Sequence, residues 1–409
     1  MSRDHAVALD AADPLRAYRA RFSIPDGVIY LDGNSLGPLP LAAKAAVQTC
    51  VEEEWGRGLI RSWNSAGWVD LPARCGERLS SLLGVAAQDV RVVDSTSINL
   101  YKLLTAALRL QSGRSTVLTE TGNFPTDLYI AEAVTKAGAQ QALRRVAFES
   151  VAEAIDETVA VVVLSHVHYR TGARHDMEAI TRRAHDCGAL VLWDLAHSAG
   201  AVPLDLAALG VDLAIGCGYK FLNGGPGAPS FLYVAPALQA ALHNPIQGWF
   251  GHARPFDFDG QYEPATGMDR WQVGTPGVLA LRSLEGALSV WEGVSATALA
   301  TKSAGLFDLL AAWVDGPLAN EGFELLTPTD PARRGSQLSL RHAQAWPICQ
   351  ALIHEGVIGD FRQPDILRFG LTPLYLRYVD VWDAGNRLTQ IMQSGRWQAP
   401  RFHQPQRVT

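Results

Sequence analysis

The sequence predicts an α/β fold with a mostly parallel sheet, because short apolar segments rich in β-branched residues flank a segment of helical periodicity in mid-chain. The apolar segments cover residues 159–164, 189–193, 213–215 and 230–234, and residues 177–186 have helical spacing that ends before a glycine. Continuous apolar runs are typical of strands that are buried on both faces. With 409 residues, the chain is long enough to add a second domain.

The segments before this sheet predict an N-terminal arm. Residues 14–21 have a short helical pattern, and residues 30–40 form a loop whose glycines and prolines give it a fixed path. A helix is expected to follow from residue 41 to about residue 55. We therefore expect residues 1–55 to form an arm that contributes to a small domain.

The segments after the sheet predict that small domain. A helical pattern with apolar residues from Leu281 to Trp291 starts near Pro276, and such a helix can bridge two domains. Beyond it we expect an α+β unit with edge strands at 333–341 and 366–369 and a final helix near 380–392. The predicted boundaries are 56–275 for the large domain and 276–409 for the small one.

Composition points to a soluble protein that binds a small molecule. Hydrophobic residues make up 48%, charged residues 19%, and the net charge is −6, with no Lys/Arg block of the kind that binds nucleic acid. No apolar run reaches the roughly 18 residues of a membrane span, and the N-terminus lacks the apolar core of a signal peptide. The five scattered cysteines form no Cys-x-x-Cys pair, which predicts reduced thiols and a cytoplasmic location.

Two charged residues follow predicted strands and carry the main chemical signal. Asp194 closes the strand 189–193, at the edge of a sheet where ligands bind, although alone it is as readily a helix N-cap. Lys220 follows the strand at 213–215, and a lone lysine there is usually a solvated surface residue. Together with His197, the pair matches the needs of pyridoxal-5'-phosphate (PLP): a lysine for the Schiff base and a carboxylate for the pyridine nitrogen.

Two further segments can complete such a site. Residues 94–100 place hydroxyl groups before a helical run, where backbone N–H groups can bind a phosphate, but an ordinary N-cap is equally consistent. Residues 121–127 carry Phe124, which can stack on a cofactor ring or belong to the core, and Asp127, which can bond to ring substituents. The histidines of 166–168 come without a His-Glu-x-x-His motif or a cysteine quartet, so we predict no metal site.

Taken together, the motifs resemble those of the kynureninase family, over nearly the whole chain. The family's enzymes have the fold-type-I PLP architecture, in the aspartate-aminotransferase superfamily. The resemblance therefore implies a mostly parallel, seven-stranded-type sheet in the large domain and an α+β C-terminal domain. The segments that carry it are Gly33-Asn-Ser-Leu-Gly37, Asn123-Phe-Pro-Thr-Asp127, Val167-His-Tyr-Arg-Thr-Gly172, Asp194-Leu-Ala-His197, Tyr219-Lys-Phe-Leu-Asn223, Gly248-Trp-Phe-Gly-His252 and Leu367-Arg-Phe-Gly-Leu-Thr-Pro373.

The resemblance implies a role for each matching position. Lys220 would carry the cofactor, Asp194 would pair with its ring nitrogen, and Tyr219 would be the acid/base for water addition. The other implied cofactor contacts are Thr96, Ser97, Phe124, Asp127, Ser165, His197, Trp249 and Thr275. The resemblance also implies a homodimer with its site at the subunit interface, in which Trp249 and Thr275 can come from the other subunit. The implied substrate contacts are Arg368, whose guanidinium suits a carboxylate, and Ser35, Trp63 and Phe250.

The implied activity is that of a hydrolase acting on a carbon–carbon bond in a ketone: L-kynurenine to anthranilate and L-alanine, in tryptophan catabolism. Trp63 and the Gly274-Thr275 pair are similar to the bacterial enzymes that favour kynurenine, with 3-hydroxykynurenine as the lesser substrate. Two alternatives stay open from the residues alone. One is a cysteine-desulfurase-like lyase, for which Cys349 is a poor candidate because its setting is helical, and the other is a non-catalytic binding protein of the same fold.

Overall fold

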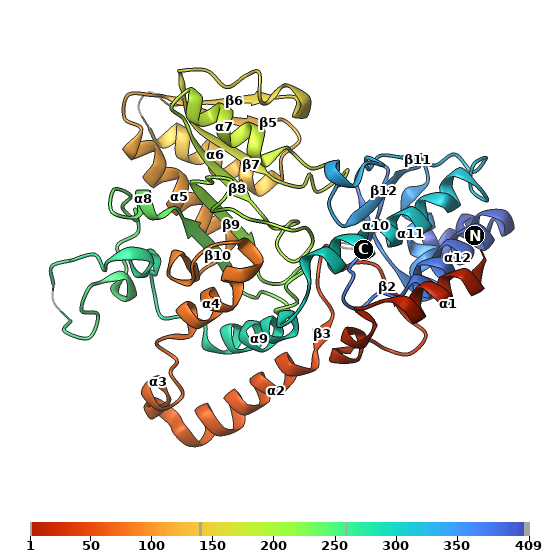
Figure 1. Cartoon of the computed structure of the whole chain (residues 1–409), viewed down its shortest axis with the longest axis horizontal. Coiled ribbons are helices and arrows are strands. Elements are labelled where there is room, and N and C mark those ends of the chain that lie inside the picture. Colours follow the sequence, from red (N-terminus) through yellow and green to blue (C-terminus); the bar gives the residue numbers. More distant parts are fainter. Residues whose placement is uncertain (1, 139–140, 259, 405–409) are drawn as a thin grey trace.

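The computed structural model describes residues 2–138, 141–258 and 260–404. Its seven-stranded sheet and a separate four-stranded sheet lie in two bodies joined by α9 (Val278–Leu288) and α10 (Ala296–Asp315) (Figure 1). No helix within these residues is long and apolar enough to cross a membrane. The two-body arrangement agrees with the α/β architecture predicted from the sequence.

The large sheet has the strand order β4-β10-β9-β8-β7-β5-β6. Neighbouring strands from β6 to β9 run parallel, whereas β10 is antiparallel to both β9 and β4. The predicted mostly parallel sheet is therefore confirmed. The strands are β4 (Val90–Val92), β5 (Thr116–Glu120), β6 (Ala142–Val146), β7 (Val159–Ser165), β8 (Leu190–Asp194), β9 (Leu213–Cys217) and β10 (Ser230–Val234).

Helices cover both faces of this sheet, which explains the continuous apolar runs. Successive residues of β7 belong to opposite cores: Val161 and Val163 pack with α5 and α6, and Val162 and Leu164 pack with the core that includes α7. Every residue of β7 is buried. The covering helices are α4 (Leu71–Leu83), α5 (Thr96–Leu110), α6 (Pro125–Ala137) and α7 (Met177–Asp186).

The small sheet is antiparallel, with the order β11-β12-β15-β14. The prediction of edge strands at 333–341 and 366–369 is wrong, because β12 and β15 pair with each other in the interior of the sheet. The two-residue strand β11 and the three-residue strand β14 supply the edges, and neither is long enough to leave a clear pattern in the sequence. The strands are β11 (Glu324–Leu325), β12 (Gln337–Arg341), β14 (Asp360–Arg362) and β15 (Ile366–Gly370).

The N-terminal helix α1 (Arg3–Ala12) was not predicted, and it packs against α12 (Tyr378–Ser394). The Asp10 carboxylate accepts hydrogen bonds from the backbone N–H groups of Tyr378 at 2.6 Å and Val379 at 3.0 Å, and so caps α12. Asp13 pairs with Lys302 of α10 at 2.7 Å, with both side chains buried. The predicted helical start at 14–21 is the 3-10 helix Arg16–Arg21.

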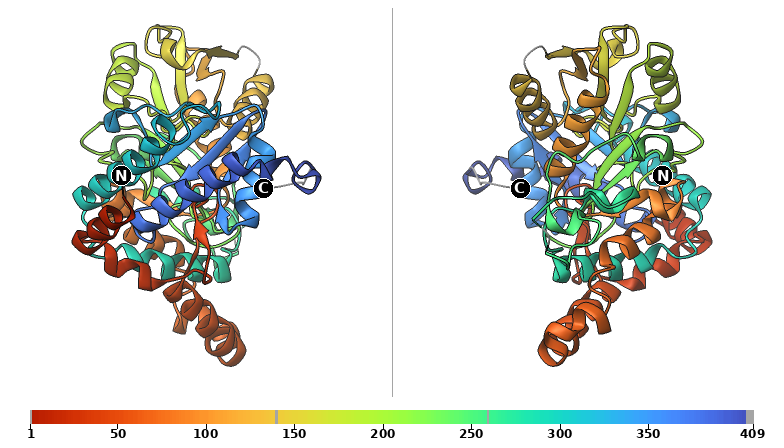
Figure 2. Two further views of the ribbon diagram at one scale, coloured as in Figure 1. Left: turned by 90° about the vertical axis from the view of Figure 1, so that its right-hand side faces the viewer. Right: turned by 90° about the vertical axis from the view of Figure 1, so that its left-hand side faces the viewer.

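The helix predicted at 41–55 changes its winding on the way. It is α-helical as α2 (Leu41–Thr49) and then a π-helix at Cys50–Gly58, followed by α3 (Ser62–Ser65). This helical segment, residues 41–65, projects from the body at the foot of both views in Figure 2. It exposes large apolar side chains, among them Trp55 and Ile60. A single chain therefore leaves a hydrophobic surface exposed to solvent.

Short elements complete the chain. They are β1 (Phe22–Ser23), β2 (Ile29–Tyr30), β3 (Leu39–Pro40), β13 (Val357–Ile358), α8 (Pro236–Gln239) and α11 (Ala345–His354). The parallel pair β2–β13 joins the N-terminal segment to the small domain. We propose the division into an arm at 1–55, a large domain at 56–275 and a small domain at 276–409, although α9 itself packs against α2 and α4.

Candidate active site

A cavity of about 230 Å³ opens at the carboxyl ends of the parallel strands. Ser165, Asp194 and Cys217 are the last residues of β7, β8 and β9, so adjacent strands deliver three side chains to one edge. This is the edge where open α/β sheets bind ligands. Its lining also includes Asp94, Ser95, Thr96, Ser97, Phe124, Thr126, Asp127, Tyr169, Ala196, His197, Tyr219, Lys220, Gly227 and Ala228.

Lys220 is held in the cavity by a tight turn after β9. The N–H of Gly224 donates to the carbonyl of Gly218 at 2.8 Å, and the N–H of Asn223 donates to the carbonyl of Lys220 at 3.0 Å. The Lys220 side chain is 9% exposed, and its Nζ lies 2.9 Å from Nε2 of His197 and 5.5 Å from the centre of the Phe124 ring. The lysine is therefore buried beside its partners rather than solvated.

Two carboxyl groups, Asp194 and Asp127, face each other beside this lysine. Burial raises the pKa of Asp194, and the positive charge of Lys220 opposes that shift. Burial and the neighbouring Asp194 together raise the pKa of Asp127 well above its ordinary value. Like charges this close favour a shared proton. Asp194 also accepts from the N–H of Ala196 at 2.8 Å, but turns rather than a helix follow it, so the alternative of a helix N-cap is wrong.

His197 is a neutral member of the cluster. Burial, with Lys220 next in importance, lowers the pKa of His197 well below its ordinary value. A neutral imidazole that carries its proton on Nδ1 can accept a hydrogen bond from Lys220 at Nε2. The Nδ1 atom is buried without a partner among the described residues, as is Oδ1 of Asp127. These polar atoms are suited to a polar ligand in the cavity.

The start of α5 also lines the cavity. Ser95 caps this helix of 15 residues, and Thr96 and Ser97 occupy its first turn, where N–H groups and the helix dipole favour an anion. Asp94 precedes the cap with a left-handed φ of 50°. The buried Lys102 holds it there, donating to Asp94 at 2.6 Å and to the carbonyl of Trp271 at 2.7 Å.

Arg368 lies in β15 of the small domain and connects to the cavity through Tyr169. Its guanidinium is 1% exposed and forms an ion pair with Asp360 of β14. It also donates to the backbone carbonyl of Tyr169, which lines the cavity, and to Oγ of Ser35 at 3.1 Å. Ser35 in turn donates to Asp360 at 2.6 Å. The structure therefore gathers Arg368 and Ser35 into one polar cluster beside the cavity.

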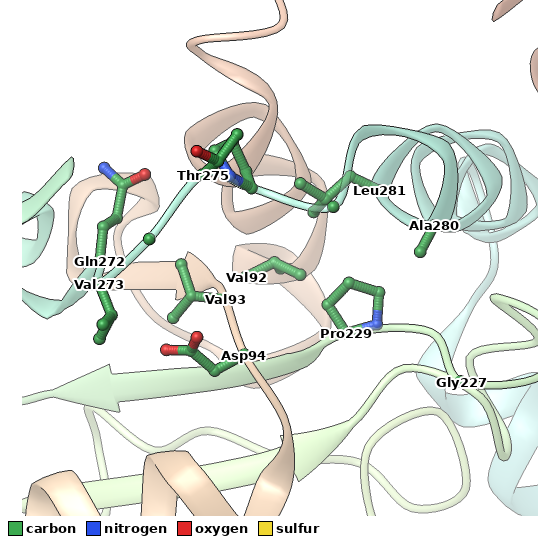
Figure 3. Close-up of a pocket in the computed structure, with 13 residues that line it drawn as sticks. Val92, Val93, Asp94, Gly227, Pro229, Gln272, Val273, Thr275, Ala280 and Leu281 are labelled. Carbon is green, nitrogen blue, oxygen red and sulfur yellow. The ribbon is translucent and has the colours of Figure 1, made fainter. Parts of the chain in front are cut away.

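The remaining predicted residues lie outside the lining of this cavity. Thr275 lines an adjoining pocket of about 240 Å³, which also includes Asp94 and Gly227 (Figure 3). Trp249 is 41% exposed and packs against Phe250, with ring centres 4.4 Å apart. The ring centres of Trp63 and Phe250 lie 6.0 Å apart. Within one chain, these three aromatic residues thus form a cluster of their own.

Asp32 adds a titratable group to the Arg368 cluster and gives a test of it. Burial, followed by the negative charge of Asp360, raises the pKa of Asp32 to about 7. The pKa of an aspartate in an unfolded chain is about 3.9. Ionising Asp32 therefore costs free energy in the folded state, and stability from this group is lost as the pH rises from about 4 to about 7. We expect Asp32→Asn to raise the melting temperature relative to wild type more at pH 8 than at pH 5.

Thermal unfolding followed by circular dichroism at the two pH values measures this difference. Asp26→Asn is the control, because Asp26 is an exposed aspartate in the same N-terminal segment. Its change in melting temperature relative to wild type should be the same at pH 5 and pH 8. An Asp32→Asn shift that is the same at pH 5 and pH 8 contradicts the assignment.

Sequence reasoning missed several members of the site. Asp360 and Arg362 were not singled out, and their alternation along a short strand is the signal that could have marked them. Tyr169 belongs to the motif Val167-His-Tyr-Arg-Thr-Gly172, and the sequence indicated no separate role for it. Asp94 opens the segment 94–100 that was predicted to bind a phosphate, and Cys217 follows the predicted strand at 213–215, but the sequence indicated no role for either side chain.

Comparison with known proteins is consistent with this geometry. A family model described as "Kynureninase C-terminal domain" matches residues 299–388. Curated relatives named kynureninase include one from Pseudomonas fluorescens, 48% identical with 100% of both chains covered, and one from Burkholderia mallei (strain SAVP1), 46% identical with 98% of each chain covered.

Solved structures share the fold at low identity. One is a C-DES mutant with glycine covalently linked to the PLP cofactor, with a TM-score of 0.77 and 18% identity over 91% of this chain and 98% of the other. Another is a cysteine desulfurase from Escherichia coli, with a TM-score of 0.74 and 19% identity over 93% of this chain and 98% of the other. At such identities the likeness concerns the fold alone.

The parallel sheet, the buried strand-end lysine and the carboxyl beside it define a PLP-dependent enzyme of fold type I. Its residues fit that cofactor, because the cavity offers an amine at Lys220, unpaired buried polar atoms on Asp127 and His197, and an anion-binding helix start at Thr96. At 46–48% identity over the full length of its relatives, the chain belongs to the kynureninase family.

Proposed function

We propose that this protein cleaves L-kynurenine with water to anthranilate and L-alanine, with 3-hydroxykynurenine as a lesser substrate. The observation that carries the proposal is the burial of Lys220, Asp194 and Asp127 in one cavity of a chain that is 48% identical to a kynureninase. The substrate in this proposal is taken from the name of these relatives. The geometry supplies the groups that such a cleavage needs.

Different residues of the cavity would hold different parts of the cofactor. Lys220 is the residue that would bind it covalently, Asp194 would pair with its ring nitrogen, and Phe124 would stack on its ring. Thr96 and Ser97 would bind its phosphate at the start of α5. Asp127 and Ser165 would bond near its ring oxygen. When bound, PLP supplies an electron sink for negative charge at the substrate's α-carbon.

Two side chains move protons in the proposed reaction. Lys220, once the substrate's amine has displaced it, takes the proton from the α-carbon, and His197 at 2.9 Å keeps Nζ in place. Burial raises the pKa of Tyr219, so its hydroxyl stays protonated. That hydroxyl can donate to the γ-carbonyl oxygen as water adds, which prepares the carbon–carbon bond for cleavage.

A desulfurase-like reaction has little support from the cysteines. Cys349 lies in α11, is fully buried, and its thiol pKa is raised by burial. Cys217 lines the cavity, but it too is buried with a raised pKa. A reactive cysteine needs access and a lowered pKa, and neither residue has both.

Anthranilate fluorescence tests the proposed activity directly. We expect purified protein with PLP to produce anthranilate from L-kynurenine, and one L-alanine for each anthranilate. Protein that shows the visible absorption of a lysine-bound cofactor but forms no anthranilate would refute the kynurenine assignment while leaving the cofactor site intact.

We further propose that the enzyme is a homodimer in which Trp249 and Thr275 serve the partner's site. Trp249, Phe256 and Phe258 form an exposed aromatic cluster, with Trp249 and Phe258 stacked at 6.2 Å. Such a cluster is typical of a surface that another protein covers. Thr275 lines a pocket that shares Asp94 with the Lys220 cavity, so a group entering there would lie next to the phosphate end.

Mixing two inactive variants tests this arrangement. We expect Lys220→Ala and Thr275→Glu to be weakly active or inactive alone, since Glu places a negative charge beside a phosphate. Subunit exchange should restore activity, because a mixed dimer has one site with both residues intact. Each variant taken through the same refolding procedure alone is the control. If mixed dimers form and no activity appears, Thr275 does not act across the interface.

A further inference from the structure

We propose that Arg362 is a second cation for the α-carboxylate of the substrate, beside Arg368, and that Asp360 orients both guanidinium groups. The proposal rests on the kynurenine-cleaving function above. It assigns the carboxylate to a pair of arginines rather than to Arg368 alone.

The first observation is that Arg368 is largely committed to protein partners. Its Nε donates to Asp360 at 2.7 Å, and its Nη2 also bonds to Asp360 and to Ser35. Its Nη1 donates to the carbonyl of Tyr169. With 1% of the side chain exposed, Arg368 has few N–H groups left for a second carboxylate.

The second observation is that Arg362 meets the same partners and is more open. Its Nη2 lies 2.8 Å from Oδ2 of Asp360 and 3.2 Å from Oγ of Ser35. Its Nη1 donates only to the carbonyl of Phe361 among the described residues. The side chain is 35% exposed, so its remaining N–H groups are available to an incoming anion.

The third observation is the balance of charge. The two guanidinium groups face Asp360, which is buried and whose pKa is lowered chiefly by Arg368 against the effect of burial. Asp32, the other carboxyl of the cluster, has its pKa raised by burial and by Asp360. A partly neutral Asp32 leaves the cluster with excess positive charge, which a substrate carboxylate would neutralise.

The cluster also lies close enough to the cavity to act there. Arg368 and Arg362 both lower the pKa of His197, the residue beside Lys220. Tyr169 lines the cavity, bonds to Arg368 through its carbonyl and interacts electrostatically with Arg362. A substrate with its amine at Lys220 can therefore extend its α-carboxylate toward this pair of arginines.

Steady-state kinetics of Arg362→Gln test the proposal. We expect KM for L-kynurenine to rise about 10- to 100-fold, the value of a charge-assisted hydrogen bond, with kcat nearly unchanged. The dissociation constant of L-alanine should rise in parallel. Binding of the decarboxylated amine of kynurenine, which lacks the carboxylate, should not change.

Further variants make the result specific. Arg362→Lys keeps the charge without the planar fork and should show a smaller rise in KM. Arg341→Gln, which removes an exposed arginine from β12 of the same sheet, should leave KM as in wild type. Cofactor absorption should be the same in all variants.

Two outcomes would overturn the proposal. One is an unchanged KM and L-alanine affinity in Arg362→Gln and Arg362→Lys. The other is a loss of activity that comes with loss of cofactor absorption, which indicates a structural role. Absence of anthranilate formation by the wild type is a different failure, since it removes the proposed function itself.

Discussion

Replacing Lys220 by alanine is expected to abolish turnover. The side chain is buried in the cavity, and among the residues that the structure describes no other lysine lines it, so none of them offers a second amine to bind the cofactor covalently or take the α-proton. The loss of a positioned acid–base group alone lowers kcat by about 10²- to 10⁴-fold. Anthranilate fluorescence measures the loss, and visible absorption spectra should show that the lysine-bound form of the cofactor has disappeared.

Lys136→Ala is the matched control, because Lys136 is exposed on α6 and forms an ion pair with Glu132 at 2.6 Å, away from the residues that line the cavity. It should keep wild-type kinetics and spectra. A small primary amine added to the Lys220→Ala protein should recover part of the activity if the missing group is the amine. Full activity in Lys220→Ala would disprove both its covalent and its proton-transfer role.

The second large effect is expected from Asp194→Asn. A neutral amide cannot hold a positive charge on the ring nitrogen as a carboxylate does, so the electron sink weakens. Loss of a hydrogen bond between charged groups predicts a fall in kcat of at least about 10- to 100-fold. Cofactor affinity should fall as well, and both can be measured by titrating PLP into the variant.

Asp212→Asn separates this effect from a general loss of stability. Asp212 is also a buried aspartate next to a strand of the large sheet, but it bonds to the N–H of Val191 and to His185, away from the residues that line the cavity. It should lower the melting temperature without a comparable loss of kcat. Equal kinetic losses in Asp194→Asn and Asp212→Asn would argue against a special role for Asp194.

The sequence could predict the strands β7 to β10 of the large sheet because each is buried and reads as an apolar run. The interior strand β5 is also buried, but its sequence includes Thr116, Thr119 and Glu120, and it was not predicted. Asp194 and Lys220 follow such strands directly, so their meeting at one edge was predictable. The small domain was harder. Its outer strands have two and three residues, too few for a periodic signal, and the interior position of β12 and β15 depends on them.

The Arg368 cluster could not be derived from spacing. Asp360 and Arg368 are eight residues apart and become direct partners only through the antiparallel register of β14 and β15. Ser35 reaches them from more than 300 residues away in the chain. The family resemblance implied a carboxylate-binding role for Arg368, but its ion pair with Asp360 is a product of tertiary packing.

The contact of Asp10 with the start of α12 has a consequence for the order in which the protein folds during synthesis. The two residues are 368 positions apart, so the first helix leaves the ribosome long before the helix that it caps exists. The large sheet lies wholly between them and can form first, since domains generally fold as units during synthesis. Until α12 is made, the Asp10 carboxylate lacks the N–H groups of Tyr378 and Val379, so the small domain can complete this contact only after that helix forms.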